Sequence, residues 1–270
     1  MCLILVAWNH HPHFPLIVIS NRDEFYQRPT QIPHFWVDQA TIYAGRDLQA
    51  EGTWLGVNRF KQFAAVTNYR DPSRLKTNVE SRGQLTAQFL RHDQSLDDYL
   101  NHLKTKADYY NDFNLILYDQ QQLVCFESKS KQSHTLSSGI YGLSNHFLDT
   151  PWPKVTSSKK KFNQLLTHWP DGTNTLNDLQ IEQRYLSQLS DILSDETIYP
   201  DSELPHTGMP LDIERRLSAA FIKSDDYGTR ATTVVIGNQT GDFLFYEKQY
   251  GVNGMFEGET CRIVTHLEVN

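Results

Sequence analysis

The order of apolar patterns along the chain is the feature that most limits what it can fold into. Short β-rich runs come first, amphipathic helical patterns occupy the middle, and β-rich runs return near the end. Strands and helices segregated in this way are typical of antiparallel sheets covered by helices. The order therefore predicts an α+β protein.

Pairs of short apolar runs, each joined by a polar turn, predict β-hairpins. The predicted strands cover residues 3–8 with 16–20, 53–57 with 63–67, 114–118 with 123–126, and 232–236 with 243–246, and residues 262–267 add a last strand. The second residue of the chain is therefore expected at the start of a buried strand.

Five stretches carry apolar residues three and four positions apart, the spacing of amphipathic helices. They cover residues 83–91, 96–107, 154–168, 176–193 and 211–221, and a Pro-bearing stretch at 199–210 is expected to form a long surface loop. Neither an internal repeat nor a clear interdomain linker interrupts these patterns. Because 39% of the 270 residues are hydrophobic, residues 1–270 are predicted to share one core as a single domain.

Composition excludes several classes of partner. The formal net charge is −7, and the one compact basic run, Lys159-Lys160-Lys161, fits the solvated start of a helix, so nucleic acid is not an expected partner. No apolar run approaches the roughly 18 residues that a membrane helix needs, and the opening run is too short for a secretory signal. We therefore expect no membrane span and a cytoplasmic location.

The three cysteines, Cys2, Cys125 and Cys261, are an odd number without CxxC spacing. This pattern indicates neither a disulfide framework nor a cysteine zinc site and fits a reducing compartment. Cys125 lies between Val124 and Phe126 and is predicted to be a buried strand residue.

Cys2 is the first candidate for chemistry. Removal of Met1 would place a thiol and a free α-amine on one residue, and their ordinary pKa values of about 8.5 and about 7.7 to 8.0 allow proton exchange near neutral pH. The residue could then supply both nucleophile and base. A small apolar residue that opens a strand is the alternative interpretation.

The tetrad Asn21-Arg22-Asp23-Glu24 follows the second predicted strand, where the hairpin returns the chain beside its start. A carboxylate there could orient the α-ammonium, and a guanidinium could lower the pKa of the thiol. A charged turn would have the same composition, so the residues alone leave both interpretations open.

Eight motifs in this order give the chain a close resemblance to the NRDE family, also called the transport and Golgi organisation protein 2 family. They are Met1-Cys2, Asn21-Arg22-Asp23-Glu24 with Arg28-Pro29, Gly52-Thr53-Trp54-Leu55-Gly56-Val57, Thr67-Asn68, Ser81-Arg82-Gly83, Leu143-Ser144-Asn145, Pro151-Trp152-Pro153-Lys154 and Thr229-Arg230-Ala231-Thr232-Thr233. Glu51 departs from the pattern, which has a second glycine there, and this departure bears on the local turn geometry.

That family is similar in turn to the N-terminal-nucleophile hydrolases, so the resemblance implies a four-layer αββα sandwich of two antiparallel sheets. Closest in layout are the cysteine amidases that cleave penicillin V and conjugated bile acids. By position, the catalytic residues implied here are Cys2, Arg22, Asp23, Asn68, Asn145 and Arg230. The amidases separate the residues that correspond to Arg22 and Asp23. Adjacent side chains on a strand point to opposite faces, so we expect Asp23 alone to lie beside the α-amine.

The implied reaction is hydrolysis of a non-peptide amide through an acyl-enzyme. The Cys2 thiolate attacks the carbonyl, the α-amine carries the proton, and Asn68 and Asn145 donate hydrogen bonds to the oxyanion. Trp54, His146 and Trp152 are the candidates for substrate binding, although core packing is the simpler interpretation of each tryptophan. The mechanism requires no cofactor.

Two other interpretations remain open. His10, His11 and His13 could bind a metal or haem, but they crowd one predicted turn with Pro12 and without accompanying carboxylates, which favours an exposed turn. A non-catalytic carrier could use the same cleft for haem or a lipid-like ligand, since relatives of the family are associated with haem handling and lipid metabolism. An organising protein is the least supported class, because the sequence has no repeat or coiled coil.

Overall fold

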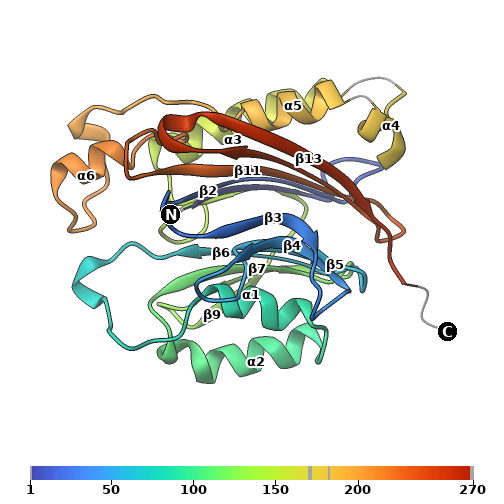
Figure 1. Ribbon diagram of the computed structural model, residues 1–270, viewed down its shortest axis with the longest axis horizontal. Coiled ribbons are helices and arrows are strands. Elements are labelled where there is room, and N and C mark those ends of the chain that lie inside the picture. The colour runs from blue at the N-terminus through green and yellow to red at the C-terminus, as the bar shows by residue number, and fades with distance from the viewer. Residues whose placement is uncertain (1, 170–171, 182, 268–270) are drawn as a thin grey trace.

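The protein is a sandwich of two antiparallel sheets that face each other, with helices on both outer faces (Figure 1). This computed structural model describes residues 2–169, 172–181 and 183–267, and for residues 2 and 181 it describes the backbone alone. The arrangement confirms the α+β class and the four layers expected from the sequence.

The first sheet contains the first strand of the described chain and its last three strands. Its six strands run in the order β10-β1-β2-β11-β12-β13. They are β1 (Cys2–Trp8), β2 (Leu16–Phe25), β10 (Gly139–Leu143), β11 (Tyr227–Gly237), β12 (Phe243–Tyr250) and β13 (Phe256–Val264). The predicted first hairpin is therefore confirmed, and β2 lies between β1 and a strand from the last fifth of the chain.

The second sheet is built from the segment between these ends. Its seven strands lie in sequence order. They are β3 (Thr30–Phe35), β4 (Ile42–Asp47), β5 (Leu55–Asn58), β6 (Phe63–Asn68), β7 (Phe113–Tyr118), β8 (Leu123–Glu127) and β9 (Gln132–Thr135). Both predicted hairpins of this region are confirmed, and Cys125 is fully buried in β8.

Helices cover the outer face of each sheet. In Figure 1, α1 and α2 lie against the second sheet, and α3, α4 and α5 lie against the first. The α-helices are α1 (Gly83–Leu90), α2 (Leu96–Lys106), α3 (Pro153–Thr167), α4 (Leu176–Ile181), α5 (Gln183–Asp191) and α6 (Leu211–Arg216), and the 3₁₀ turns are η1 (Pro72–Arg74), η2 (Ala107–Tyr109), η3 (Asp201–Glu203) and η4 (Val252–Gly254).

Burial on both faces explains why the first strands are apolar without alternation. Along β2, Ile17 and Ile19 pack toward the helices, whereas Leu16 and Val18 pack between the sheets. Successive strand residues point to opposite faces, so a strand covered on both sides needs apolar residues at every position. The polar residues at the end of β2 stand out against this background.

Three predicted elements differ from the structure. The helix expected at 211–221 ends at Arg216, because the residues after it form an irregular segment whose main chain bonds to buried side chains. The stretch 176–193 contains two helices, α4 and α5, on either side of residue 182, which lies outside the described residues. The last strand covers Phe256–Val264 and not 262–267.

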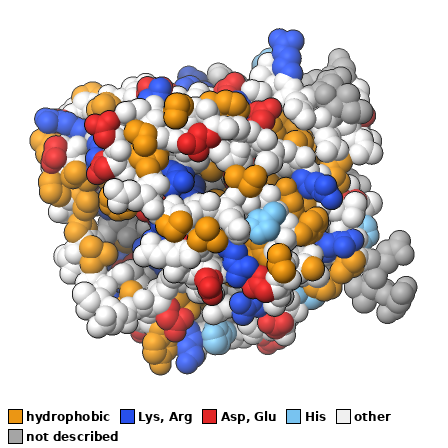
Figure 2. Space-filling view, viewed as in Figure 1, with side chains coloured by type: hydrophobic (Ala, Val, Ile, Leu, Met, Phe, Trp, Pro, Cys, Tyr) orange, Lys and Arg blue, Asp and Glu red, His pale blue; other side chains and the backbone are white. Residues whose placement is uncertain are grey.

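The described residues include no helix long and apolar enough to cross a membrane. On the face in Figure 2, acidic and basic side chains are interspersed with apolar ones. Exposed charges also pair locally, as Arg215 does with Asp201 at 2.6 Å. Exposed pairs of this kind contribute little to stability.

Candidate active site

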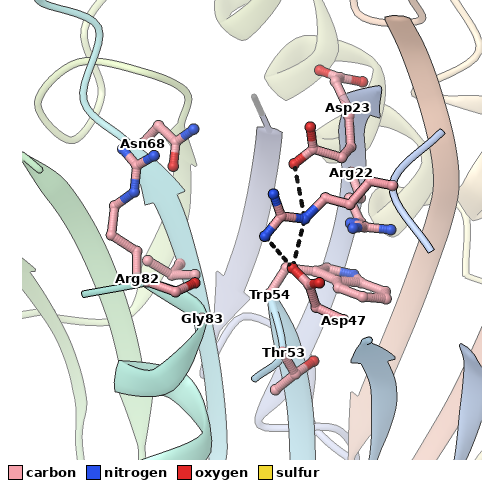
Figure 3. A pocket seen from close by; sticks show the side chains of 12 residues that line it. Arg22, Asp23, Asp47, Thr53, Trp54, Asn68, Arg82 and Gly83 are labelled. Atoms are coloured by element: carbon pink, nitrogen blue, oxygen red, sulfur yellow. Dashed lines mark hydrogen bonds and ion pairs between the residues drawn. The ribbon is translucent and has the colours of Figure 1, made fainter. Parts of the chain in front are cut away.

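A pocket of about 120 Å³ lies where β2 of one sheet faces β4 and β6 of the other (Figure 3). We call it the inter-sheet pocket. Its lining is mostly charged and polar: Arg22, Asp23, Glu24, Arg28, Asp47, Thr53, Trp54, Val66, Asn68, Ser81, Arg82 and Gly83. The backbone of Cys2 lies at the same end of the sandwich, since it pairs with Arg22.

Glycines bring the walls of this pocket together. A Cβ atom on Gly52 would lie 2.4 Å from the carbonyl carbon of Gly83, so only glycine lets residues 52–53 approach the start of α1. A Cβ atom on Gly45 would lie 2.4 Å from the ring of Trp54. These close approaches fix the Trp54 ring against β4.

The turn before Gly52 explains the departure at Glu51. Glu51 has φ of +55°, which lies in the left-handed region that favours glycine. A glycine at this position, as the resemblance implies for relatives, would adopt the same backbone without strain. The turn geometry is thus retained here by a non-glycine residue.

Arg22 and Asp23 have separate surroundings. The Arg22 guanidinium lies 3.9 Å from the centre of the Trp54 ring and donates a hydrogen bond to Thr30 Oγ1 at 2.9 Å. Asp23 accepts a hydrogen bond from Thr229 Oγ1 at 2.7 Å. Figure 3 shows the Asp23 carboxylate turned away from the Arg22 guanidinium. Both residues line the pocket, but their side chains contact different parts of the sandwich: Arg22 contacts Trp54 and Thr30, and Asp23 contacts Thr229.

Burial dominates the electrostatics of Asp23. The side chain is only 2% exposed, and this desolvation raises the pKa of the carboxyl group above its ordinary value. The positive charge of the chain's amino group acts most strongly in the opposite direction, followed by the charge of Lys154, the hydrogen bond from Thr229 and the charge of Arg70. Asp23 is therefore a carboxylate whose ionisation depends on buried cations.

Cys2 is described by its backbone alone, and its thiol lies outside the described residues. The backbone of Cys2 begins β1 and pairs with Arg22 of β2. Since Arg22 lines the inter-sheet pocket, the first strand begins next to that pocket.

The two asparagines have different positions. Asn68, at the end of β6, lines the inter-sheet pocket, and its side-chain amide has no hydrogen-bond partner among the described residues. Asn145 is fully buried and donates a hydrogen bond from Nδ2 to the Asn68 carbonyl at 2.9 Å. Asn145 thus holds the main chain that presents Asn68 and is not among the lining residues.

Arg230 lies in a neighbouring pocket of about 90 Å³, which we call the Glu247 pocket. Its Nη1 donates to the main-chain carbonyls of Phe25, Tyr26 and Arg28 at 3.0 to 3.2 Å. Arg230 therefore fixes the turn after β2. Its guanidinium is not brought to the inter-sheet pocket.

Of the three predicted substrate-binding residues, the structure brings only Trp54 to the inter-sheet pocket. His146 lines a separate surface pocket, where its Nδ1 lies 2.9 Å from Thr150 Oγ1. Trp152 is mostly buried, and the Arg70 guanidinium lies 4.8 Å from its ring centre.

Other lining residues were not predicted as site residues. Arg28 forms an ion pair with Asp47 at 2.6 Å. Arg82 is the residue directly before α1. Figure 3 shows Arg82 with Asn68, across the pocket from Trp54. Arg28 and Arg82 belong to motifs of the resemblance and could have been found there, whereas Asp47 carries no sequence signal.

Glu247 is a further buried ionisable group near Arg22. It is 2% exposed on β12, accepts a hydrogen bond from Thr233 Oγ1 at 2.7 Å and lines the pocket that Arg22 and Trp54 share with it. Burial raises the pKa of its carboxyl group to about 7, and the charge of Arg22 partly opposes that shift. The sequence alone does not predict that Glu247 is buried, because a single Glu beside a strand pattern is usually exposed.

The histidine-rich turn packs on aromatic rings. The His11 ring centre lies 4.3 Å from that of Trp169 and 5.1 Å from that of Phe14. Burial and the neighbouring His13 lower the pKa of His11 to about 4. In the part of the chain that the structure describes, no three His, Cys, Asp or Glu residues are grouped to hold a metal ion.

Comparison with solved structures finds proteins of low sequence identity to this chain. A conjugated bile acid hydrolase from Clostridium perfringens, solved as a mutant, is similar in structure, with a TM-score of 0.45 and 11% identity over 100% of this chain and 94% of that one. An N-acylethanolamine-hydrolyzing acid amidase ortholog from Caenorhabditis elegans has a TM-score of 0.38 and 9% identity, and the alignment covers 87% and 92% of the two chains.

Sequence relatives are much closer. The Transport and Golgi organization protein 2 homolog of Bos taurus is 33% identical over 92% of both chains, and the Mus musculus homolog is 30% identical over 98% of this chain and 97% of that one. The family model described as Transport and Golgi organisation 2 matches residues 1–251. The chain therefore belongs to the Transport and Golgi organisation 2 family.

Proposed function

We propose that the protein is an amidohydrolase that cleaves a non-peptide amide, with Cys2 as its nucleophile after removal of Met1. The observation that carries this proposal is the pairing of the Cys2 backbone with Arg22 at a pocket that Asp23 and Asn68 also line. A nucleophile, a carboxylate and an amide donor at one site are the components of acyl transfer.

In the proposed reaction, the Cys2 thiol gives its proton to the α-amine and the sulfur attacks the amide carbonyl carbon. The C–N bond breaks as the α-amine returns the proton to the leaving nitrogen, which forms a thioester. Water then attacks the thioester, releases the acid and restores the thiol. The ionised form of Asp23, which Lys154 and Arg70 favour, would orient the α-amine while that amine carries the proton.

Asn68 is the proposed oxyanion donor because its side-chain amide lines the pocket and is unpaired among the described residues. A well-placed donor of this kind contributes roughly 2.7 to 4 kcal/mol to transition-state stabilisation. Asn145 is the proposed positioning residue for Asn68, through its hydrogen bond to the Asn68 carbonyl.

The size and lining of the pocket favour this function over a carrier of haem or a long acyl chain. Its volume is about 120 Å³, and among the described residues that line it only Trp54 and Val66 are large and apolar. Sites for hydrophobic ligands are typically about 300 to 1,000 Å³ and mostly apolar. A carrier would have to open this cleft widely.

The first test is the intact mass of the natively expressed protein before and after a brief treatment with an alkylating reagent at neutral pH. We expect loss of Met1 and rapid modification of Cys2 alone, because burial raises the pKa of Cys125 and raises that of Cys261 to about 11. Cys2→Ala should abolish the rapid modification, and Cys261→Ala should leave it unchanged.

A screen of N-acyl amides would follow with Asn68→Ala. We expect kcat to fall by about 10² to 10³ while Cys2 is still modified rapidly, since the oxyanion donor acts only after attack. Retention of Met1, or a Cys2 that reacts no faster than Cys261, would contradict the proposed function and favour a carrier.

A further inference from the structure

A buried lysine lies on the helix side of the candidate site. Lys154, in the first turn of α3, is 3% exposed, and its Nζ donates to the carbonyl of Leu217 at 2.8 Å and to that of Ala219 at 3.4 Å. Burial of an ammonium group is costly unless hydrogen bonds and nearby opposite charge compensate it. We therefore asked which neighbouring groups compensate the burial of Lys154.

The segment that Lys154 binds is also bound by the strands of the site. Asn21 Nδ2 donates to the carbonyl of Ala220 at 2.8 Å, and Thr229 Oγ1 accepts from the main-chain nitrogen of Ile222 at 2.9 Å. The same Thr229 hydroxyl donates to Asp23 at 2.7 Å. Residues 217–222 thus form a buried brace that connects Lys154 to Asp23 through Thr229.

The charges around Asp23 come from several elements. Lys154 of α3 and Arg70, which follows β6, both favour its ionised form, and the Tyr227 hydroxyl of β11 donates to its carbonyl at 3.1 Å. Arg70 is itself paired with the buried Glu214 of α6 at 2.5 Å. In the proposed reaction the α-amine adds a further positive charge. Lys154, by contrast with Arg70, uses its described hydrogen bonds on main-chain carbonyls.

We propose that Lys154 is a positioning residue for Asp23: its hydrogen bonds to the 217–222 brace hold Thr229, the donor to Asp23, in place, and its ammonium group lies on the helix side of this carboxylate. The inference rests on the proposed function only where Asp23 is said to orient the α-amine. The link between Lys154 and Asp23 can be tested whether or not the protein hydrolyses amides.

The test measures the pKa of Asp23 by the ¹³C resonance of its carboxyl group in the full-length protein, assigned with Asp23→Asn. We expect Lys154→Met to raise this pKa by about 1, the effect of losing one nearby cation. Lys154→Arg should restore the wild-type value. Lys160→Met is the matched control, because Lys160 lies on the same helix and is exposed.

Modification of Cys2 gives a second readout. We expect Lys154→Met to slow it about tenfold near neutral pH and to displace its pH profile upward, with recovery in Lys154→Arg. A wild-type Cys2 that is inert would contradict the proposed function and leave the Asp23 titration still informative. An unchanged pKa of Asp23 in Lys154→Met would overturn the inference even in an active enzyme.

If Lys154→Met does not fold, a titration of the wild-type protein still tests the link between Lys154 and Asp23. The ¹⁵Nζ resonance of Lys154 should show an inflection at the pKa of Asp23, and Asp23→Asn should remove that inflection. An Nζ resonance that does not respond to Asp23 would assign Lys154 a purely structural role and reject the proposal.

Discussion

The two faces of β2 at its polar end differ in what they contact. On the face toward the second sheet, Arg22 lies against an aromatic ring and borders two pockets. On the face toward the helices, Asn21 and Asp23 are almost fully buried and hydrogen-bonded to segments roughly 200 residues away, and Asp23 also borders the inter-sheet pocket. The side chain on the first face borders space that a ligand could occupy. The side chains on the second face fix the position of β2 through buried hydrogen bonds.

Loss of Asn21 should show how strongly the helix-side face is held. Asn21 donates to the carbonyls of Leu193 and Ala220 and accepts from Thr232 Oγ1 at 2.6 Å. Asn21→Ala leaves these buried groups unsatisfied, so we expect the free energy of unfolding to fall by about 3 kcal/mol. Urea denaturation measures this value. A loss below about 1 kcal/mol would mean that water or rearrangement replaces the bonds.

The pH dependence of stability tests the burial of Glu247, which lines a pocket together with Arg22. Its pKa in the folded protein, about 7, exceeds its ordinary value of 4.5, so the unfolded chain ionises first as pH rises. Stability from this group is therefore present below about pH 4.5 and is lost progressively up to about pH 7. Relative to wild type, Glu247→Gln should gain roughly 2 kcal/mol between pH 5 and pH 8 in urea unfolding. Parallel pH profiles of the two proteins would refute the assignment.

Trp54→Phe separates the stacking of Arg22 from the burial of Asp23. The smaller ring weakens the cation–π contact and leaves a gap beside Gly45, so a loss of about 1 kcal/mol is expected. The carboxyl resonance of Asp23 should titrate as in wild type. If that titration shifts as well, the two faces are coupled and the contrast between them fails.

Glu51→Gly should have the smallest effect and the opposite sign. Glu51 occupies the left-handed region at φ of +55° in the turn that leads to Trp54. Glycine removes the steric cost but adds freedom to the unfolded chain, so we expect a gain of about 0.5 kcal/mol. Glu51→Ala, which keeps the strain, should not show this gain in thermal unfolding.

Strong local patterns account for the part of the fold that the sequence predicts. The hairpin of β1 and β2 has continuous apolar runs, and the helices α1, α2 and α3 have clear apolar periodicity. The sequence predicts these elements to within one to five residues. The strands that escaped prediction lack such periodicity. Proline interrupts β3, two glycines lie in β10, and β9 is a polar edge strand held by pairing with β8. Such strands depend on their neighbours.

The candidate site divides in a similar way. Arg22, Asp23, Asn68 and Trp54 lie at strand ends beside apolar runs, where polar residues are conspicuous, and the structure brings them to one pocket. The positions of the other candidate residues depend on contacts with parts of the chain that are distant in sequence. Asn145 and Arg230 bond to main-chain carbonyls, and Lys154 is buried by a segment 63 residues later in the chain. No local pattern encodes such partners.

The place of β11 beside β2 has a consequence for how the molecule is made. Thr229, the hydrogen-bond partner of Asp23, follows it by 206 residues, so a ribosome releases β2 long before the strand that covers its second edge. Until then that edge lacks its partner, and the polar end of β2 cannot be buried. Closure of the pocket around Asp23 therefore comes among the last steps of folding.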